Sequence, residues 1–136
     1  MAIQKKSKKE LKQVKALTDG IMPPQKLEHT ECAKAMLPVK DALEVLSGRW
    51  KLPIIVSMIF GKKRFKEISK EVNGITDKVL SKELKDLEMN KLITRTVYDS
   101  FPPMVEYEIT EHGKSLQEVI LALNKWGTTH RKKIIG

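Results

Sequence analysis

Apolar and polar residues follow a clear helical pattern in the stretch GITDKVLSKELKDLE, residues 74–88. Leu80, Leu84 and Leu87 recur at the spacing that lines one face of an α-helix. Thr76 is placed to cap the N-terminus of that helix, because its hydroxyl can accept a hydrogen bond from a backbone N–H group. The pattern therefore predicts an amphipathic helix with hydroxyls and charges on its outer face.

A second, shorter amphipathic helix comes directly before it. Phe65, Ile68 and Val72 mark the apolar face of this helix. Asn73 and Gly74 separate the two helices, and both residue types tolerate a left-handed backbone. This part of the chain therefore predicts a helix, a tight turn and a second helix.

Two apolar segments precede this pair of helices. Pro38 suits the first position of a helix whose apolar residues recur through Leu46, and Ser47-Gly48 ends it. The next segment, WKLPIIVSMIFG, begins at Trp50 and is almost wholly apolar, with its proline in the first turn. We expect it to form the central helix of the core.

Strand-forming residues dominate the following region. LITRTVY and MVEYEI are rich in β-branched and aromatic residues with alternating character, and DSFPP joins them, so they predict a hairpin. Thr110 can cap a last helix that carries apolar residues along one face. The predicted order is helix, helix, helix-turn-helix, two-stranded wing and long helix. This is a winged helix-turn-helix, a mainly α (α+β) fold in which the second helix of the turn lies in the DNA major groove.

Length and charge are consistent with one soluble domain. The chain has 136 residues, 40% hydrophobic content and a formal charge of +9, a size that supports a real core and a charge that favours anionic partners. We see no apolar run long enough to span a membrane, no signal-peptide core after the basic first residues, and a single cysteine that cannot form an internal disulfide. We therefore expect a cytoplasmic protein without a membrane partner.

The positive charge is concentrated at the beginning of the chain. Residues 1–30 contain seven lysines against three acidic residues, a net charge of +4. A possible capping box at Ser7 predicts a short helix there, and Pro23-Pro24 lies in a stretch without apolar periodicity. We expect a basic N-terminal extension and linker over residues 1–30, acting as a solubilising arm or packing on a partner subunit, and a winged-helix DNA-binding domain over residues 31–136.

Hydroxyls and cations on the outer face of the helix at residues 74–88 fit contacts with base edges and phosphates. The candidate recognition residues are Thr76, Lys78, Ser81, Lys82 and Lys85. Cations that flank the preceding helix, and one near the base of the hairpin, are candidate phosphate contacts. These are Lys62, Lys63, Arg64, Lys66 and Arg95.

Acidic residues on the same helix give an alternative interpretation. Asp77, Glu83, Asp86 and Glu88 would pair with lysines one turn away and would be repelled by phosphate. A lysine-bearing helix face is also often just solvated. The prediction of DNA binding therefore depends on the order of the elements before it depends on charge.

From Leu37 to Gly127 the chain resembles the HxlR family of bacterial transcriptional regulators, which are winged-helix proteins related in architecture to the MarR group. The resemblance is carried by LPVKDALEVLSGRWKLPII, GKKRFKEI, GITDKVLSKELKDLE, LITRTVY and PPMVEYEITEHGKSL, in this order. It implies a homodimer that binds a pseudo-palindromic operator, with the first and last helices of the domain in the dimer interface. On these helices the interface residues would be Val39, Leu43, Leu116, Val119, Ile120, Leu123 and Trp126.

Single positions follow the family pattern or depart from it. Gly48-Arg49-Trp50 matches the family's Gly-Lys/Arg-Trp signature, in which Trp50 would anchor the core or the helix packing, and Tyr107 is expected to pack inward. Met104 stands where relatives commonly carry a basic residue in the wing, so the wing tip offers little charge to a minor groove.

The family's frequent redox cysteine is absent from its usual place. That position, directly before the Pro-Val pair, is Leu37 here, and the only thiol is Cys32, five residues upstream. Cys32 is a redox thiol if it lies at the dimer interface or near Lys34, because a nearby cation favours the thiolate. Otherwise it is a small buried or linker residue.

Catalysis is not expected. His29, His112 and His130 are isolated, and the sequence shows no metal-binding cluster, phosphate-binding glycine loop or nucleophile elbow. We therefore expect no enzyme, no cofactor and no metal. The prediction is a sequence-specific, homodimeric regulator of transcription, a repressor, that binds double-stranded DNA. The alternative is a non-catalytic protein-interaction module that uses the C-terminal apolar helix and the basic face.

Overall fold

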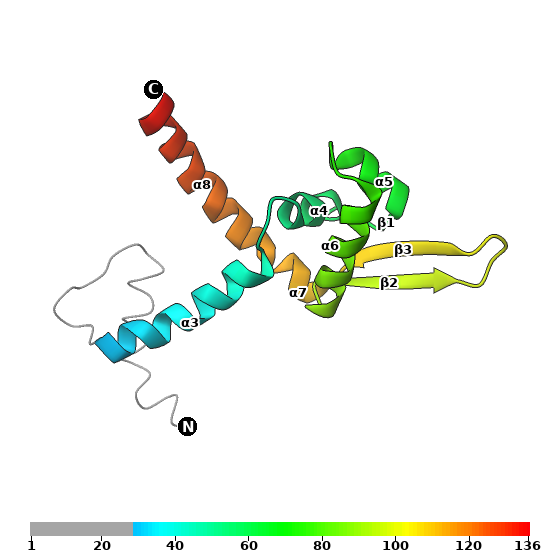
Figure 1. Cartoon of the computed structure of the whole chain (residues 1–136), viewed down its shortest axis with the longest axis horizontal. Coiled ribbons are helices and arrows are strands. Elements are labelled where there is room, and N and C mark those ends of the chain that lie inside the picture. The colour runs from blue at the N-terminus through cyan, green and yellow to red at the C-terminus, as the bar shows by residue number, and fades with distance from the viewer. Residues whose placement is uncertain (1–28) are drawn as a thin grey trace. The chain divides into compact units, whose positions relative to one another are not determined.

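The structure, a computed structural model, describes residues 29–136 (Figure 1). The chain divides into two compact units, Met1–Val45 and Leu46–Gly136. The expected basic extension therefore lies almost entirely outside the described residues.

The first unit contributes one continuous helix, α3, which runs from His29 to Val45. The prediction that a helix begins at Pro38 was wrong, because Pro38 lies inside α3. A proline in a helix interior costs about 3 kcal/mol because it removes one backbone hydrogen bond. The stretch ECAKAML just before it consists mostly of strong helix formers, which favour continuation of the helix through the proline.

The second unit begins with the predicted central helix. This helix, α4, spans Lys51–Ser57, and the side chains of Ile54, Ile55 and Met58 are completely buried. It ends earlier than the apolar pattern suggested, and Phe60 in the turn that follows is 98% exposed. The apolar run therefore supplies the core with one helix and leaves one aromatic side chain at the surface.

The helix-turn-helix follows as predicted. It consists of α5, Phe65–Glu71, and α6, Asp77–Met89. Gly74 in the turn has a φ of 89°, a left-handed conformation that glycine adopts without strain. The hydroxyl of Thr76 accepts a hydrogen bond from the Val79 N–H at 3.2 Å, which confirms the predicted cap.

Leucines of α6 fasten that helix to the core. Leu80, Leu84 and Leu87 are at most 1% exposed, as the helical spacing predicted. They join apolar side chains from α4, α5 and the sheet. The other completely or almost completely buried residues are Ile54, Ile55, Met58, Ile68, Leu92 and Ile93.

The hairpin is confirmed, but the sheet has a third strand. Strands β2, Ile93–Tyr98, and β3, Met104–Ile109, pair antiparallel, and the two-residue strand β1, Lys63–Arg64, pairs with the other edge of β3. The strand order is β1-β3-β2. The predicted two-stranded wing is therefore confirmed as β2 and β3. The strand β1 was not predicted, because a two-residue strand is too short to show an alternating pattern. We call β2, β3 and the connecting residues 99–103 the wing.

Two helices complete the second unit. Thr110 caps the short helix α7, Glu111–Lys114, by accepting a hydrogen bond from the Gly113 N–H at 2.9 Å. The long helix α8, Leu116–Ile135, follows after Ser115 (Figure 1). The predicted last helix is therefore two helices, and Thr110 fixes the first of them.

Candidate nucleic-acid interface

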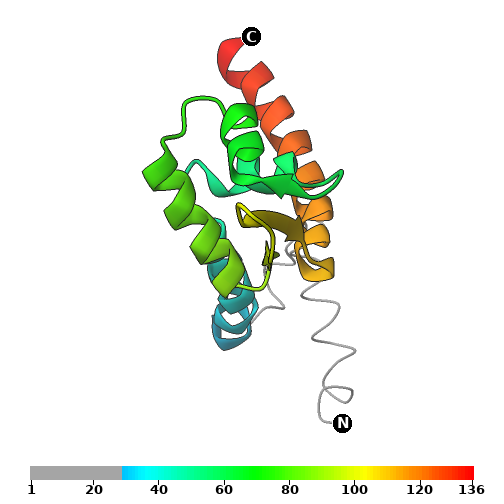
Figure 2. The same cartoon turned by 90° about the vertical axis from the view of Figure 1, so that its right-hand side faces the viewer.

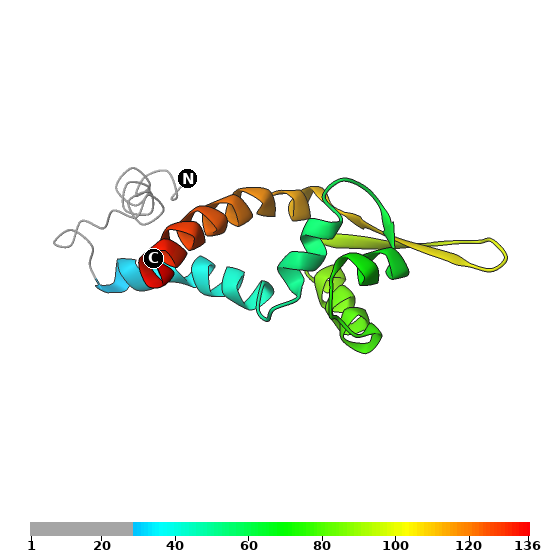
Figure 3. The ribbon, with the colours of Figure 1, turned by 90° about the horizontal axis from the view of Figure 1, so that it is seen from above.

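Helix α6 lies along the outside of the second unit, where the views show one of its sides open (Figure 2, Figure 3). Lys78, Lys82 and Lys85 recur at helical spacing on this side and are exposed. Thr76 is exposed at the N-terminus, and Ser81 is half-buried between the lysines. Four of the candidate recognition residues therefore share one accessible side of the helix, and Thr76 lies at its N-terminal end.

The acidic residues of α6 occupy different environments. Glu83 is 9% exposed and points toward α4, where the ammonium of Lys51 lies 2.5 Å from its Oε1. Asp86 lies between Lys51, at 3.6 Å, and Lys82, at 3.5 Å. The sequence analysis predicted ion pairs one helical turn apart, as in Lys82–Asp86, but it missed the pairing of Glu83 with Lys51 of α4. The available signal was Glu83 itself, which interrupts the leucine stripe of α6 at a core-facing position.

The candidate phosphate contacts gather around β1 and the start of α5. Lys62, Arg64 and Lys66 are exposed. The ammonium of Lys63 instead donates hydrogen bonds to both carboxylate oxygens of Glu71, each at 2.8 Å. Lys63 is therefore partly neutralised within the unit, and the other three cations are more accessible to an anion.

Arg95 joins the same region through the sheet. Tyr107 of β3 is paired with Lys63 on one side and with Arg95 on the other. Residues directly opposite one another in an antiparallel sheet project on the same face, so Lys63 and Arg95 flank the buried Tyr107. Tyr107 packs inward, as expected, and the sheet places Arg95 near the base of the wing.

Trp50 supports the turn of the helix-turn-helix. A side chain at Gly74 would place its Cβ 3.8 Å from the indole ring of Trp50. The guanidinium of Arg49 lies over the same ring, 4.5 Å from its centroid. Trp50 is half-buried, so it supports the turn from the edge of the core. Arg49 is a cation beside it that the sequence analysis did not assign to the interface.

The wing tip carries an apolar side chain. Phe101 is fully exposed, and Asp99 is the only charged residue among the connecting residues 99–103. Met104, at the start of β3, is half-buried. The tip therefore presents an aromatic ring where the sequence analysis considered only charge.

Apolar side chains are exposed on both helices of the predicted dimer interface. On α3, Val39 is 44% and Leu43 is 67% exposed, and on α8 Trp126 reaches 67%. Val119 and Leu123 are also exposed, and within the described part of the chain no residue of α8 is buried.

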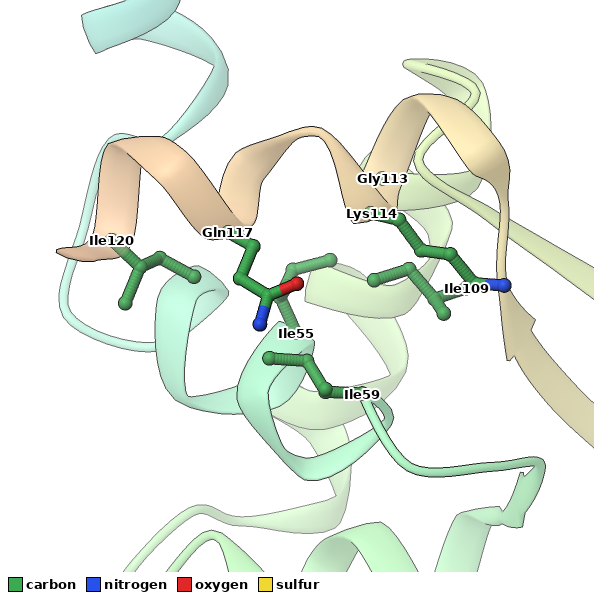
Figure 4. A pocket seen from close by; sticks show the side chains of 7 residues that line it. All are labelled: Ile55, Ile59, Ile109, Gly113, Lys114, Gln117 and Ile120. Carbon is green, nitrogen blue, oxygen red and sulfur yellow. The ribbon is translucent and has the colours of Figure 1, made fainter.

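The first turns of α8 contact α4. Figure 4 shows Ile120 and Gln117 of α8 pointing toward Ile55 and Ile59 around a cavity of about 70 Å³. An engineered cavity of about 150 Å³ is known to hold benzene, so this space is too small for an aromatic ligand. Leu116 and Ile120 are half-buried, which assigns them in part to packing within the unit.

The remaining candidates are a thiol, a metal site and a membrane-spanning helix. Cys32 of α3 is a free, half-buried thiol, and its redox role stays a prediction. Among residues 29–136, no group of three His, Cys, Asp or Glu side chains is placed to hold a metal ion. Within the same range, no helix has both the length and the apolar character needed to cross a bilayer.

Comparisons with known proteins agree with this geometry. The uncharacterized HTH-type transcriptional regulator YtcD of Bacillus subtilis strain 168 is 39% identical over 106 residues, covering 78% of this chain and 84% of YtcD. A MarR-family transcriptional regulator from Enterococcus faecalis V583 superimposes with a TM-score of 0.64 at 33% identity, covering 71% of this chain and 87% of that one. The redox regulator HypR in its reduced form gives a TM-score of 0.64 at 39% identity, covering 69% of this chain and 93% of HypR.

The fold and the relatives are those of transcriptional regulators of the helix-turn-helix type, which are not enzymes. The family model described as HxlR-like helix-turn-helix matches residues 45–134, from the end of α3 through almost all of α8. The chain therefore belongs to the HxlR-like helix-turn-helix family.

Proposed function

We propose that this regulator is a cytoplasmic homodimer that binds a pseudo-palindromic DNA operator through α6 and represses transcription there. The observation that carries the proposal is the accessible side of α6, which presents Lys78, Ser81 and Lys82 while leucines hold its other side in the core. A helix fixed in this way can enter a major groove with its polar side chains at the base edges. In this proposal Thr76 and Lys85 complete the recognition surface.

Phosphates on either side of the groove would be held by the cations around β1. Lys62, Arg64 and Lys66 are exposed beside the N-terminus of α5, and Arg95 projects from the base of the wing. Such contacts fix the position of the protein on the duplex without reading its sequence. Lys63 contributes less, because Glu71 already accepts its hydrogen bonds.

The homodimer is supported by the apolar surface of α8 and α3. Exposed side chains such as Leu123 and Trp126 on α8, and Leu43 on α3, are disfavoured in water unless another surface covers them. A second copy related by a two-fold axis would cover the exposed side chains of each helix, because such an axis uses the same residues of both subunits. Two α6 helices would then enter successive major grooves about one helical turn apart, which requires an operator with inverted half-sites. Occupation of a promoter by such a dimer blocks transcription, hence the assignment as a repressor.

Selection of bound duplexes from a randomised pool at physiological salt tests the proposal, with the mass of the purified protein measured in solution. We expect a dimer that enriches an inverted repeat. On that repeat, Ser81→Ala and Lys82→Ala should change base preference, whereas Lys66→Ala should weaken binding to every sequence equally. Lys125→Ala in α8 is the matched control, since it removes a cation that is not among the proposed DNA contacts.

The alternative is a protein-interaction module that uses α8 and the basic face, and the exposed apolar side chains of α8 favour it. A protein that enriches no duplex and whose α6 variants leave DNA binding unchanged would support this alternative. Equal losses on the inverted repeat and on random DNA for Lys82→Ala and Lys66→Ala would contradict the proposed division of roles between the two helices.

A further inference from the structure

A network of four charged side chains joins α4 to α6 beneath the proposed recognition surface. Lys51 of α4 is only 6% exposed, and its ammonium lies 2.5 Å from Glu83 and 3.6 Å from Asp86. Asp86 also lies 3.5 Å from Lys82, whose side chain is 71% exposed. Asp86 is therefore shared between a cation in the core and a cation on the surface.

The charges of α6 alone do not suit a helix that faces phosphate. Between Asp77 and Met89 the helix carries three lysines and four acidic residues, a formal charge of −1. The burial of Glu83 against Lys51 removes one of these negative charges from the accessible side. Of the other three acidic residues, Asp77 and Glu88 are exposed, and Asp86 is half-buried. Asp86 is the one that lies within 4.0 Å of a lysine of α6, at 3.5 Å from Lys82.

Asp86 competes with DNA for Lys82. An ammonium paired with a carboxylate must give up that partner, or share it, before it can bind a phosphate or a base edge. A second cation beside Asp86 weakens the ion pair between Asp86 and Lys82, because the charge of the carboxylate is already compensated from the core side. Lys51 is the only other cation within 4.0 Å of Asp86 among the described residues.

We propose that Lys51 is a positioning residue of the DNA interface, which compensates Glu83 and Asp86 from the core side and thereby frees Lys82 to contact DNA. This inference rests on the proposed function, since it requires α6 to face the duplex. Lys51 itself stays buried and does not reach the nucleic acid. Its effect passes through Asp86, so removing the Asp86 charge should matter most when Lys51 is absent.

A cycle of variants separates this role from a merely structural one. Loss of Lys51 alone would leave Glu83 buried and uncompensated, which is strongly destabilising. The informative variant is therefore Lys51→Met/Glu83→Met, which replaces both members of the buried pair, leaves the net charge unchanged and is expected to fold. The neutral pair Lys51→Gln/Glu83→Gln serves as a second variant if the methionine pair lowers the unfolding temperature below the working range.

The readout is the Kd for a fluorescent duplex that carries the selected inverted repeat, measured by anisotropy at one salt concentration with folding checked by circular dichroism. We expect the double variant to bind about twofold to fivefold more weakly than the parent, the scale of one exposed ion pair. Adding Asp86→Asn should restore the affinity in the double variant and should improve it by a smaller factor in the parent. Lys125→Met in α8 controls for loss of a cation elsewhere.

Each outcome has a separate meaning. An equal gain from Asp86→Asn in both backgrounds would overturn the role of Lys51, since the two sites would then act independently. Unchanged affinity in a folded double variant would overturn it as well. A parent protein that binds no duplex at all would instead contradict the proposed function, and that result is visible before any variant is made.

Discussion

Replacement of Gly113 by alanine should destabilise the second unit severely. A Cβ at this position would lie 2.6 Å from Cγ1 of Ile109 and closer still to the backbone oxygen of Leu92. That oxygen is held in place because it accepts a hydrogen bond from the backbone N–H of Thr110 at 3.0 Å, and the Thr110 hydroxyl donates to the neighbouring Lys91 oxygen at 2.7 Å. The clash therefore involves backbone atoms that cannot rotate away.

The expected loss follows from two contributions. Overpacking of a well-packed site typically costs about 1–3 kcal/mol. Moving α7 away from β2 to relieve the clash would also weaken the hydrogen bonds that Thr110 donates to the Leu92 and Lys91 oxygens, each worth about 1 kcal/mol. We therefore expect Gly113→Ala to lower the free energy of unfolding by about 3–5 kcal/mol.

Denaturant unfolding followed by circular dichroism measures this loss. Both proteins must be compared at one concentration, because the proposed dimerisation would make apparent stability depend on concentration. Lys114→Ala is the matched control, since it truncates an exposed neighbour on the same short helix and should change stability by less than about 0.5 kcal/mol. A Gly113→Ala protein within about 1 kcal/mol of the parent would refute the close approach of α7 to the start of β2.

Other variants test the helix-turn-helix and the cations beside it. Thr76→Ala removes the cap of α6 and should lower the free energy of unfolding by about 1 kcal/mol, whereas Leu84→Ala opens a cavity and should lower it by about 2–5 kcal/mol. Denaturant titration checks both, and a smaller loss for Leu84→Ala than for Thr76→Ala would contradict the packing of α6. For DNA, Lys66→Ala should reduce the slope of log affinity against log salt by about one. Lys63→Ala should reduce it less, because Glu71 holds that ammonium, and equal slopes would count against this ion pair.

The elements with strong local signals were predictable. The leucine stripe of α6, the turn at Gly74 and the cap at Thr76 each depend on residues within one or two helical turns, so the sequence displays them directly. Pro38 was misread for a related reason. Its preference for the first turn of a helix is real, but the helix-forming residues before it outweighed that preference.

Features that depend on distant residues were not predictable. The strand β1 exists because β3 is available to pair with it, and nothing within two residues of sequence reveals that. The pairing of Lys51 with Glu83 joins residues 32 positions apart. Of the candidate interface, the sequence therefore predicted the exposed lysines correctly as members of one helix side, but it could not show which acidic residue faces the core.

The pairing of β1 with β3 has a consequence for the kinetics of recognition. Backbone pairing at Lys63–Tyr107 and Arg64–Glu106 ties the start of α5 to the wing, so both are already ordered relative to each other before any partner arrives. The conformational entropy of that arrangement is lost during folding, not during association. A surface ordered in advance typically gains affinity through slower dissociation. Weakening this two-residue strand should therefore shorten the lifetime of a complex more than it slows its formation.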